Sequence, residues 1–176
     1  SWKRALLAGW LFGVAHFTVT DNWIATAFTY QAEMPAILGW AAVPLLALYL
    51  AVWPAFATCA AWLIARRANL LAFALAFGAM WIAAEWLRSW VFSGYSWGPF
   101  SMMMLGPWDR PGFAALLPYA GSYALSGITV ALAVALVWIG QAKRFVGIGL
   151  VCFVVAMVYF PAGKGRDGSL PLTLVQ

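Results

Sequence analysis

The sequence predicts a helical integral membrane protein. Of its 176 residues, 65% are hydrophobic and 9% are charged, whereas soluble domains are about 45–50% apolar and about 25% charged. A globule of this size cannot bury so much apolar surface, so most of it must face lipid or neighbouring membrane helices. The 12 Trp residues fit the membrane–water interfaces. The apolar runs are too long and alternate too poorly for the strands of a membrane β-barrel.

Five apolar segments are candidates for membrane spans, since a spanning helix needs about 20 apolar residues. They are residues 5–20, 37–64, 70–92, 118–139 and 145–160. The first and the last are short. The second contains Pro44 and Pro54, which predict a kink or a strong tilt. Pro118 suits the first turn of the fourth helix.

The charges between these segments predict the orientation. The pairs Lys3–Arg4, Arg66–Arg67 and Lys143–Arg144 bring six basic and no acidic residues to one side. Loops 21–35, 94–117 and 161–169 alternate with them and, with Glu85 counted there, give the other side five acidic and four basic residues. By the positive-inside rule we expect a cytoplasmic N-terminus and an extracytoplasmic C-terminus. Scattered basic pairs form no continuous basic face, so no nucleic-acid partner is expected.

The sequence changes character after the fifth segment. Residues 161–169 form a Gly-rich linker, and residues 170–176 place leucines at every second position, as at the start of a β-strand. We therefore expect 1–160 to be a membrane domain and 170–176 to begin an extracytoplasmic domain. Because the chain starts at Ser1 without a signal pattern, we also expect it to be an internal piece of a longer protein.

Glu85 and Arg88 stand three residues apart at the end of the third segment. If that helix begins near Asn69, Glu85 lies about 24 Å along it, near the outer boundary of the hydrocarbon, where Arg88 can snorkel toward the headgroups. Two interpretations stay open. The pair either only anchors the helix end, or faces the bundle interior and shapes a cavity where a polar headgroup is handled.

The stretch after this pair, residues 93–112, is rich in Gly and Pro and cannot form a regular helix. Non-helical backbone near membrane depth is tolerated only where it is buried in protein or lines a cavity. The run Met102–Met104 offers an adaptable apolar surface suited to acyl chains, although packing or an interfacial loop explains it more simply.

Other polar residues carry weaker predictions. His16 is interpreted as a hydrogen-bonding residue between helices, and Asp21 with Asn22 as a turn. Trp23 and Trp97 fit an aromatic belt, with substrate contact as the alternative.

The sequence shows no catalytic nucleophile and no metal or cofactor motif. Cys59 and Cys152 lie in apolar runs without His or Cys at metal-ligand spacing, so they are interpreted as small hydrophobic residues.

Three stretches carry a resemblance to a known family. "LLALYLAVWPAFA" (45–57), "EWLRSWVFSGYSW" (85–97) and "LTLVQ" (172–176) resemble apolipoprotein N-acyltransferases of bacteria. "NWI" (22–24) and "MP" (34–35) fit the same pattern. The resemblance implies a multi-span domain in the bacterial inner membrane, followed by an extracytoplasmic nitrilase-like domain whose first strand is similar to "LTLVQ".

The resemblance also implies the activity. Such enzymes take an acyl chain from a phospholipid, hold it as a thioester on a cysteine, and pass it to the N-terminal amine of a diacylglyceryl-cysteine lipoprotein. The cysteine, with its Glu and Lys, belongs to the nitrilase-like domain. None of the three is present in this chain, and neither Cys59 nor Cys152 matches, so no catalytic residue is expected here.

The residues that match the family lie in the charged stretch. Glu85, Arg88, Gly94, Tyr95 and Trp97 match the family's Glu-x-x-Arg and Gly-aromatic-x-Trp motifs near the active-site mouth. The candidate residues of a lipid cavity are therefore Glu85, Arg88, Tyr95, Trp97 and Trp23.

The sequence departs from the family pattern at Ser96, where Pro is usual, at Ala25, where Tyr is common, and in the Met run.

Two alternatives to an acyltransferase remain open. One is a non-catalytic membrane anchor of a polyprenyl-phosphate mannose synthase; the other is a transporter, which would show paired broken helices or mid-membrane charges.

Overall fold

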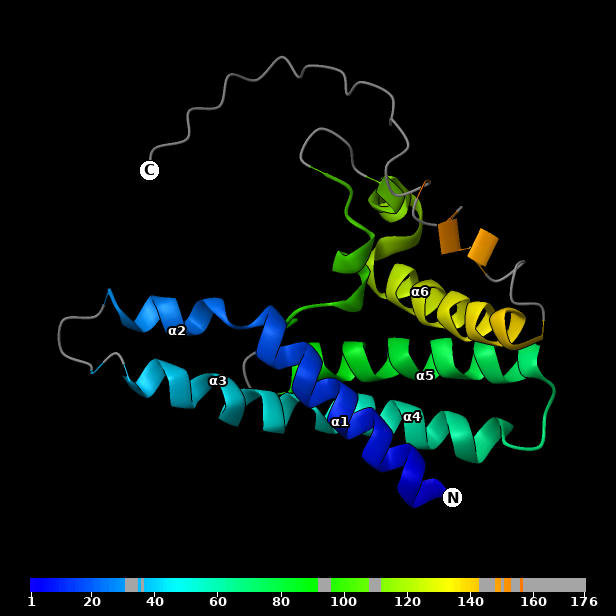
Figure 1. Cartoon of the computed structure of the whole chain (residues 1–176), viewed down its shortest axis with the longest axis horizontal. Helices are drawn as coiled ribbons and strands as arrows, with labels where there is room; N and C mark the ends of the chain where they lie inside the picture. Colours follow the sequence, from blue (N-terminus) through cyan, green and yellow to red (C-terminus); the bar gives the residue numbers. More distant parts are fainter. Residues whose placement is uncertain are drawn as a thin grey trace, which may run out of the picture.

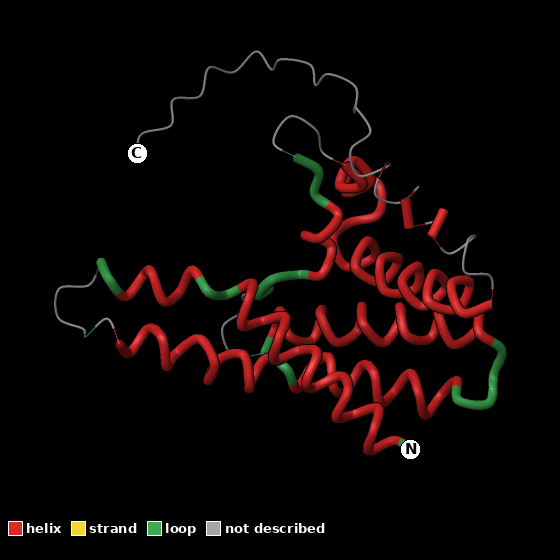
Figure 2. The backbone as a smooth tube through the Cα atoms, viewed as in Figure 1, coloured by secondary structure: helices red, strands yellow, loops and turns green. Residues whose placement is uncertain are grey.

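The computed structural model describes residues 1–30, 35, 37–91, 96–107 and 112–142, with 148–149, 151–152 and 156 beyond them. In these ranges all regular structure is helical, and no strand occurs (Figure 2). The linker predicted at 161–169 and the strand predicted at 170–176 lie outside the described residues. Most of the fifth predicted span, 145–160, lies outside them as well.

The described part consists of six α-helices and two short 3-10 helices (Figure 1). Their bounds are α1 Trp2–Thr20, α2 Trp23–Phe28, α3 Ile37–Leu50, α4 Val52–Ala65, α5 Leu70–Trp90, η1 Phe100–Met104, η2 Gly112–Leu116 and α6 Leu117–Ala142.

Three helical stretches among the described residues are long and apolar enough to cross a membrane: Ile37–Ala65, Leu70–Trp90 and Gly112–Gln141. They correspond to the second, third and fourth predicted spans. The first predicted span, 5–20, is helical as α1 but is not among the three. The count of five spans therefore stays a prediction.

The second span is interrupted, as its prolines predict. α3 ends at Leu50 and α4 begins at Val52, while Ala51 between them keeps helical angles, with φ −62° and ψ −16°. Pro54 has no N–H to donate to the carbonyl of Leu50, one turn earlier. This missing hydrogen bond accounts for the break.

Small residues let the helices approach closely. A Cβ added at Gly13 of α1 would lie 2.7 Å from the Cα of Ala51. One added at Gly78 of α5 would lie 2.7 Å from the carbonyl oxygen of Gly127 in α6. The α1–α4, α4–α5 and α5–α6 pairs form the body of the bundle (Figure 1).

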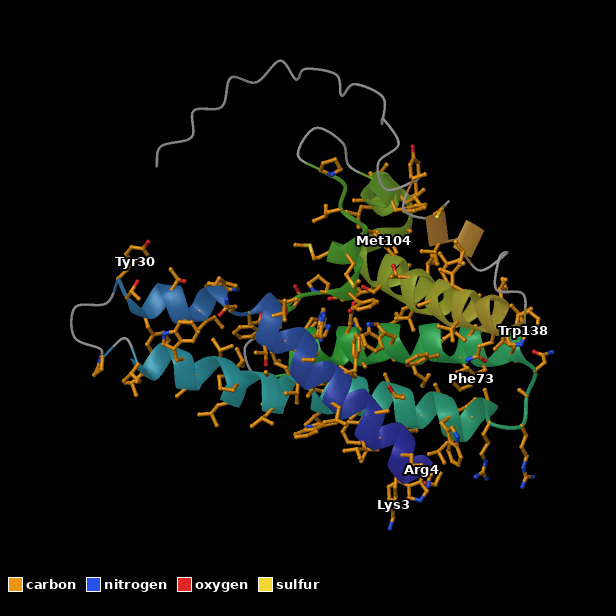
Figure 3. All side chains as sticks on the ribbon, viewed as in Figure 1. Lys3, Arg4, Tyr30, Phe73, Met104 and Trp138 are labelled. Atoms are coloured by element: carbon orange, nitrogen blue, oxygen red, sulfur yellow. The ribbon has the colours of Figure 1, made fainter. Side chains whose placement is uncertain are left out.

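The packing sorts the helix ends into two groups. Gly9 lies against Thr58 and Gly13 against Ala51, so α1 runs antiparallel to α4. The N-terminus, the α4–α5 connection and the end of α6 therefore lie at one end, and the ends of α1 and α5 lie with η1 toward the other (Figure 1). Figure 3 shows Lys3 at the first end and Tyr30 far from it.

Candidate functional site

Glu85 and Arg88 both point into the bundle. Their side chains are 3% and 4% exposed, respectively. Of the two interpretations of this pair, the one in which it shapes a cavity requires both side chains to face the bundle interior. The expected snorkelling of Arg88 toward the headgroups is wrong, because the guanidinium lies over the ring of Phe17, 4.9 Å from its centroid.

The Glu85 carboxylate uses one oxygen for two hydrogen bonds. Its Oε1 accepts from the indole Nε1 of Trp81 at 3.0 Å and from the backbone N–H of Phe100 at 2.7 Å. Its Oε2 is buried and has no hydrogen-bond partner among the described residues. Glu85 thus joins α5 to η1.

The Arg88 guanidinium is only partly satisfied. Its Nη2 donates to the carbonyl oxygen of Ser96 at 3.4 Å, whereas its Nε is buried without a hydrogen-bond partner in the described part of the chain. The negative charges of Glu85 and Asp21 both stabilise its positive charge. This cation is therefore attracted by two acidic side chains.

Asp21 and His16 belong to this cluster, and the sequence did not assign them to it. Asp21 occupies the turn after α1, is 3% exposed, and leaves Oδ2 without a partner among the residues described here. Burial raises the pKa of its carboxyl, and attraction to Arg88 opposes that rise. The Nε2 of His16 donates to the carbonyl oxygen of Gly98 at 3.5 Å. We call His16, Asp21, Glu85 and Arg88 the polar corner.

An aromatic group borders the polar corner. The ring of Phe100 lies 5.2 Å from that of Trp81 and 5.9 Å from that of Phe12, measured between centroids. His16 stacks on Phe12 at 5.8 Å. Contacts of this kind favour a fixed arrangement of rings.

The same three rings, those of Phe12, Trp81 and Phe100, also line an apolar cavity of about 290 Å³. Residues from α1, α4, α5, α6 and η1 line it: Ala8, Gly9, Phe12, Thr58, Phe77, Trp81, Phe100, Val130 and Ala133. Trp81 and Phe100 therefore line the cavity while their N–H groups bond Glu85. The polar corner and the apolar cavity share a wall.

The segment from Ser96 to Leu105 is irregular, as predicted. Gly98 has a φ of 44°, a left-handed conformation that glycine adopts readily. The backbone N–H of Ser101 donates to the Oγ of Ser126 on α6 at 2.9 Å. Met102 and Met103 are 59% and 61% exposed, which leaves them free to meet lipid; acyl contact there stays a prediction.

The other predicted site residues are Trp97, Trp23 and Tyr95, and they do not share one environment. Trp97 packs partly buried against a cluster of Phe17, Ala47 and Leu50, close to the Ser96 carbonyl that Arg88 bonds. Trp23, on α2, is 56% exposed and does not point into the polar corner. Tyr95, like Gly94, lies outside the described residues.

In the described part of the chain, no three His, Cys, Asp or Glu side chains are arranged so that they could hold a metal ion. Cys59 is buried on α4, as expected of a small hydrophobic residue. The chemistry that the arrangement offers is recognition of a molecule with one polar and one apolar end.

Comparison with known proteins places the chain in a family. A family model described as the apolipoprotein N-acyltransferase N-terminal domain matches residues 1–135. No solved structure matches the chain.

Individual relatives agree with the family model. The chain is 36% identical to an apolipoprotein N-acyltransferase of Ralstonia nicotianae over 71% of its length and 24% of the relative's. It is 30% identical to one of Chromobacterium violaceum over 85% of its length and 28% of the relative's. It is also 30% identical to one of Pseudomonas syringae pv. tomato over 96% of its length and 33% of the relative's. The chain thus spans about a third or less of these relatives, and it belongs to the apolipoprotein N-acyltransferase family.

Proposed function

We propose that this chain is the membrane portion of an enzyme that transfers an acyl chain from a phospholipid, through a thioester, to the N-terminal amine of a diacylglyceryl-cysteine lipoprotein. The observation that carries the proposal is the shared wall between the polar corner and the apolar cavity in a chain of this family. A lipid with a polar head and an apolar tail needs both environments side by side.

Arg88 is the candidate for the lipid head. Its buried Nε lacks a hydrogen-bond partner among the described residues, and a guanidinium is well suited to phosphate oxygens. Asp21 and Glu85 balance its charge while no lipid is bound. Trp97 and Trp23 are proposed to contact the lipid near the headgroups, where Trp is favoured. The family motif adds Tyr95 to this set.

The cavity is the candidate for part of an acyl tail. Its lining side chains are apolar apart from Thr58, whose hydroxyl donates to the carbonyl oxygen of Pro54 within α4. A tail that moves from lipid into such a cavity exchanges one apolar environment for another, so little free energy opposes its entry.

The reaction itself is proposed to use groups outside this chain. The resemblance assigns the cysteine, the Glu and the Lys to a nitrilase-like domain, and the bundle would contribute by holding the lipid close to them. We propose that the polar corner faces the outer side of a bacterial inner membrane. Supporting this, Lys3–Arg4 and Arg66–Arg67 lie at the opposite end of the bundle.

The test measures N-acylation of a diacylated lipopeptide by the full-length protein in native membranes. Wild type should yield the triacylated product, detected by mass spectrometry. Arg88→Gln should lower the rate by about 10- to 100-fold, because a buried hydrogen bond to a charged group is lost. We expect a rise in the apparent KM for the phospholipid to account for much of the loss.

Arg66→Gln is the matched control. Arg66 also lies 4.9 Å from an aromatic centroid, that of Trp62, but at the opposite end of α4 from the polar corner. Its activity should equal that of wild type at equal amounts of folded protein. Equal activity of Arg88→Gln would exclude a role for Arg88 in lipid binding. No product from wild type would overturn the proposal and favour the anchor alternative.

A further inference from the structure

The irregular segment 96–105 is attached to the bundle by two side-chain acceptors. Glu85 of α5 accepts the N–H of Phe100 at 2.7 Å, and Ser126 of α6 accepts the N–H of Ser101 at 2.9 Å. These are the first two residues of η1, whose N–H groups have no partners inside a short helix. Glu85 is 3% and Ser126 0% exposed, so water cannot replace either acceptor.

The Oε1 of Glu85, which accepts the N–H of Phe100, also bonds the indole ring of Trp81. Oε1 accepts the indole N–H of Trp81 at 3.0 Å in addition to the N–H of Phe100. The rings of Trp81 and Phe100 lie 5.2 Å apart, and both line the apolar cavity. One oxygen atom therefore bonds the ring of Trp81 directly and the backbone that carries the ring of Phe100.

The second oxygen of Glu85 is not used for these bonds. Within the described ranges Oε2 has no hydrogen-bond partner. The positive charge of Arg88 is stabilised by Asp21 as well as by Glu85, so loss of one negative charge still leaves it a partner. A neutral side chain with one oxygen in the place of Oε1 offers an acceptor for the same two N–H groups.

We propose that Glu85 is a positioning residue whose Oε1, together with the Oγ of Ser126, holds η1 against the bundle, so that Phe100 and Trp81 separate the polar corner from the apolar cavity. For its effect on activity this inference rests on the proposed function. The placement of η1 can be measured without any acyl transfer.

The test compares two substitutions of Glu85 in the full-length protein. Glu85→Gln keeps an oxygen that can accept both N–H groups and removes the charge. Glu85→Leu is similar in size, suits an apolar helix, and leaves both N–H groups without an acceptor. Both variants remove the charge, but only Glu85→Leu removes the hydrogen-bond acceptor. The difference between the two variants therefore measures the effect of the hydrogen bonds alone.

The direct readout is the alkylation rate of a cysteine introduced at position 101, followed by mass spectrometry of that peptide in native membranes. Ser101 is 5% exposed, and the backbone N–H that bonds Ser126 survives Ser101→Cys. In this background Glu85→Leu should raise the alkylation rate at least about tenfold, because opening of η1 becomes easier. Glu85→Gln should restore a rate close to that of the parent.

Ser126 provides the second arm. Ser126→Ala should also raise the alkylation rate of the cysteine at position 101. Thr129→Val is its matched control, since the buried Thr129 hydroxyl donates to Leu125 within α6, and it should leave the rate unchanged. An equal rise in Thr129→Val would contradict the proposal, since alkylation would then report general loosening of α6.

The rate of acyl transfer is the functional readout of the same variants. Glu85→Leu should lose about 100-fold in rate, the cost that a misplacement of about 1 Å can bring, and Glu85→Gln should recover most of it. If Glu85→Gln matches Glu85→Leu in alkylation and activity, the charge matters and the inference fails. If Glu85→Leu alkylates like the parent, η1 is held by something else, which also overturns the inference. Absence of acylation in wild type would refute the proposed function and leave the alkylation result intact.

Discussion

At the scale of single residues, Arg88 lies over an aromatic ring and is attracted by two acidic side chains, Glu85 and Asp21. A buried charge is costly unless it is paired and hydrogen-bonded. Asp21 Oδ2, Glu85 Oε2 and Arg88 Nε are all buried without hydrogen-bond partners among the described residues. Buried polar atoms without partners are rare in folded proteins, and these three belong to charged groups, for which a missing hydrogen bond costs most.

Asp21 gives a prediction on pH. The folded-state pKa of Asp21 is raised above the ordinary 3.8. The contribution of this carboxyl to stability is therefore fully present below pH 3.8 and is lost as pH rises through the raised pKa. Asp21→Asn cannot ionise and escapes this loss. Its midpoint of thermal unfolding should exceed that of wild type by about 2–4 °C at pH 7, a shift that corresponds to about 1 kcal/mol.

The same comparison at pH 4 should show a smaller difference, because pH 4 lies close to the ordinary pKa of 3.8, where little of the loss has developed. Thermal unfolding of the full-length protein in detergent at both pH values measures it. A lower midpoint for Asp21→Asn at pH 7 would mean that attraction to Arg88 outweighs the cost of burying the ionised carboxylate, which would contradict the raised pKa of Asp21.

At the scale of elements, α5 organises the site. Its buried residues recur every three or four positions on one face: Ala74, Gly78, Trp81, Ala84, Glu85 and Arg88. The helix begins at Asn69, whose Oδ1 accepts the N–H of Ala72 at 2.9 Å, an ordinary N-cap. The small residues in the middle of this face let α5 pack closely on α6. The residues at its end, Glu85 and Arg88, are the part of the polar corner that α5 contributes.

Gly78 gives the prediction for this element. Gly78→Ala would place a Cβ 2.7 Å from the backbone oxygen of Gly127, and backbone cannot move aside as a side chain does. The helices must separate, which should cost about 1–3 kcal/mol of unfolding free energy despite the better helix propensity of Ala.

The matched control is Gly140→Ala on α6, where an added Cβ would meet nothing within 4 Å among the described residues. Thermal unfolding should show Gly140→Ala at or slightly above wild type and Gly78→Ala clearly below it. If both variants behave alike, close α5–α6 packing at Gly78 is not what stabilises the pair.

Local signals explain which helices could be predicted. Asn69 marks the start of α5, because an N-cap acts locally. Pro118 lies in the first turn of α6, as expected, but the backbone leaves the helical conformation at Gly121, which the sequence did not predict. The break near Pro54 follows from a missing donor. The 3-10 form of η1 was not predictable, since it depends on acceptors supplied by Glu85 and Ser126 from other helices.

At the scale of the whole molecule, antiparallel packing gathers the polar corner at one end of the bundle and the basic pairs Lys3–Arg4 and Arg66–Arg67 at the other (Figure 1). Alternating charges in the sequence predict this sorting. They could not predict that Asp21 joins Glu85 and Arg88, because those residues are more than 60 positions away and only the packing of α1 brings them together.

The most direct test of the account is the sidedness of the two ends in intact cells. Lys3→Cys and Tyr30→Cys replace exposed residues at opposite ends of the described structure. A membrane-impermeant maleimide should label the Tyr30→Cys variant in intact cells or spheroplasts, and should label the Lys3→Cys variant only after permeabilisation. Labelling of Lys3→Cys without permeabilisation, or of both variants from one side, would contradict a membrane bundle with its polar corner at the outer face.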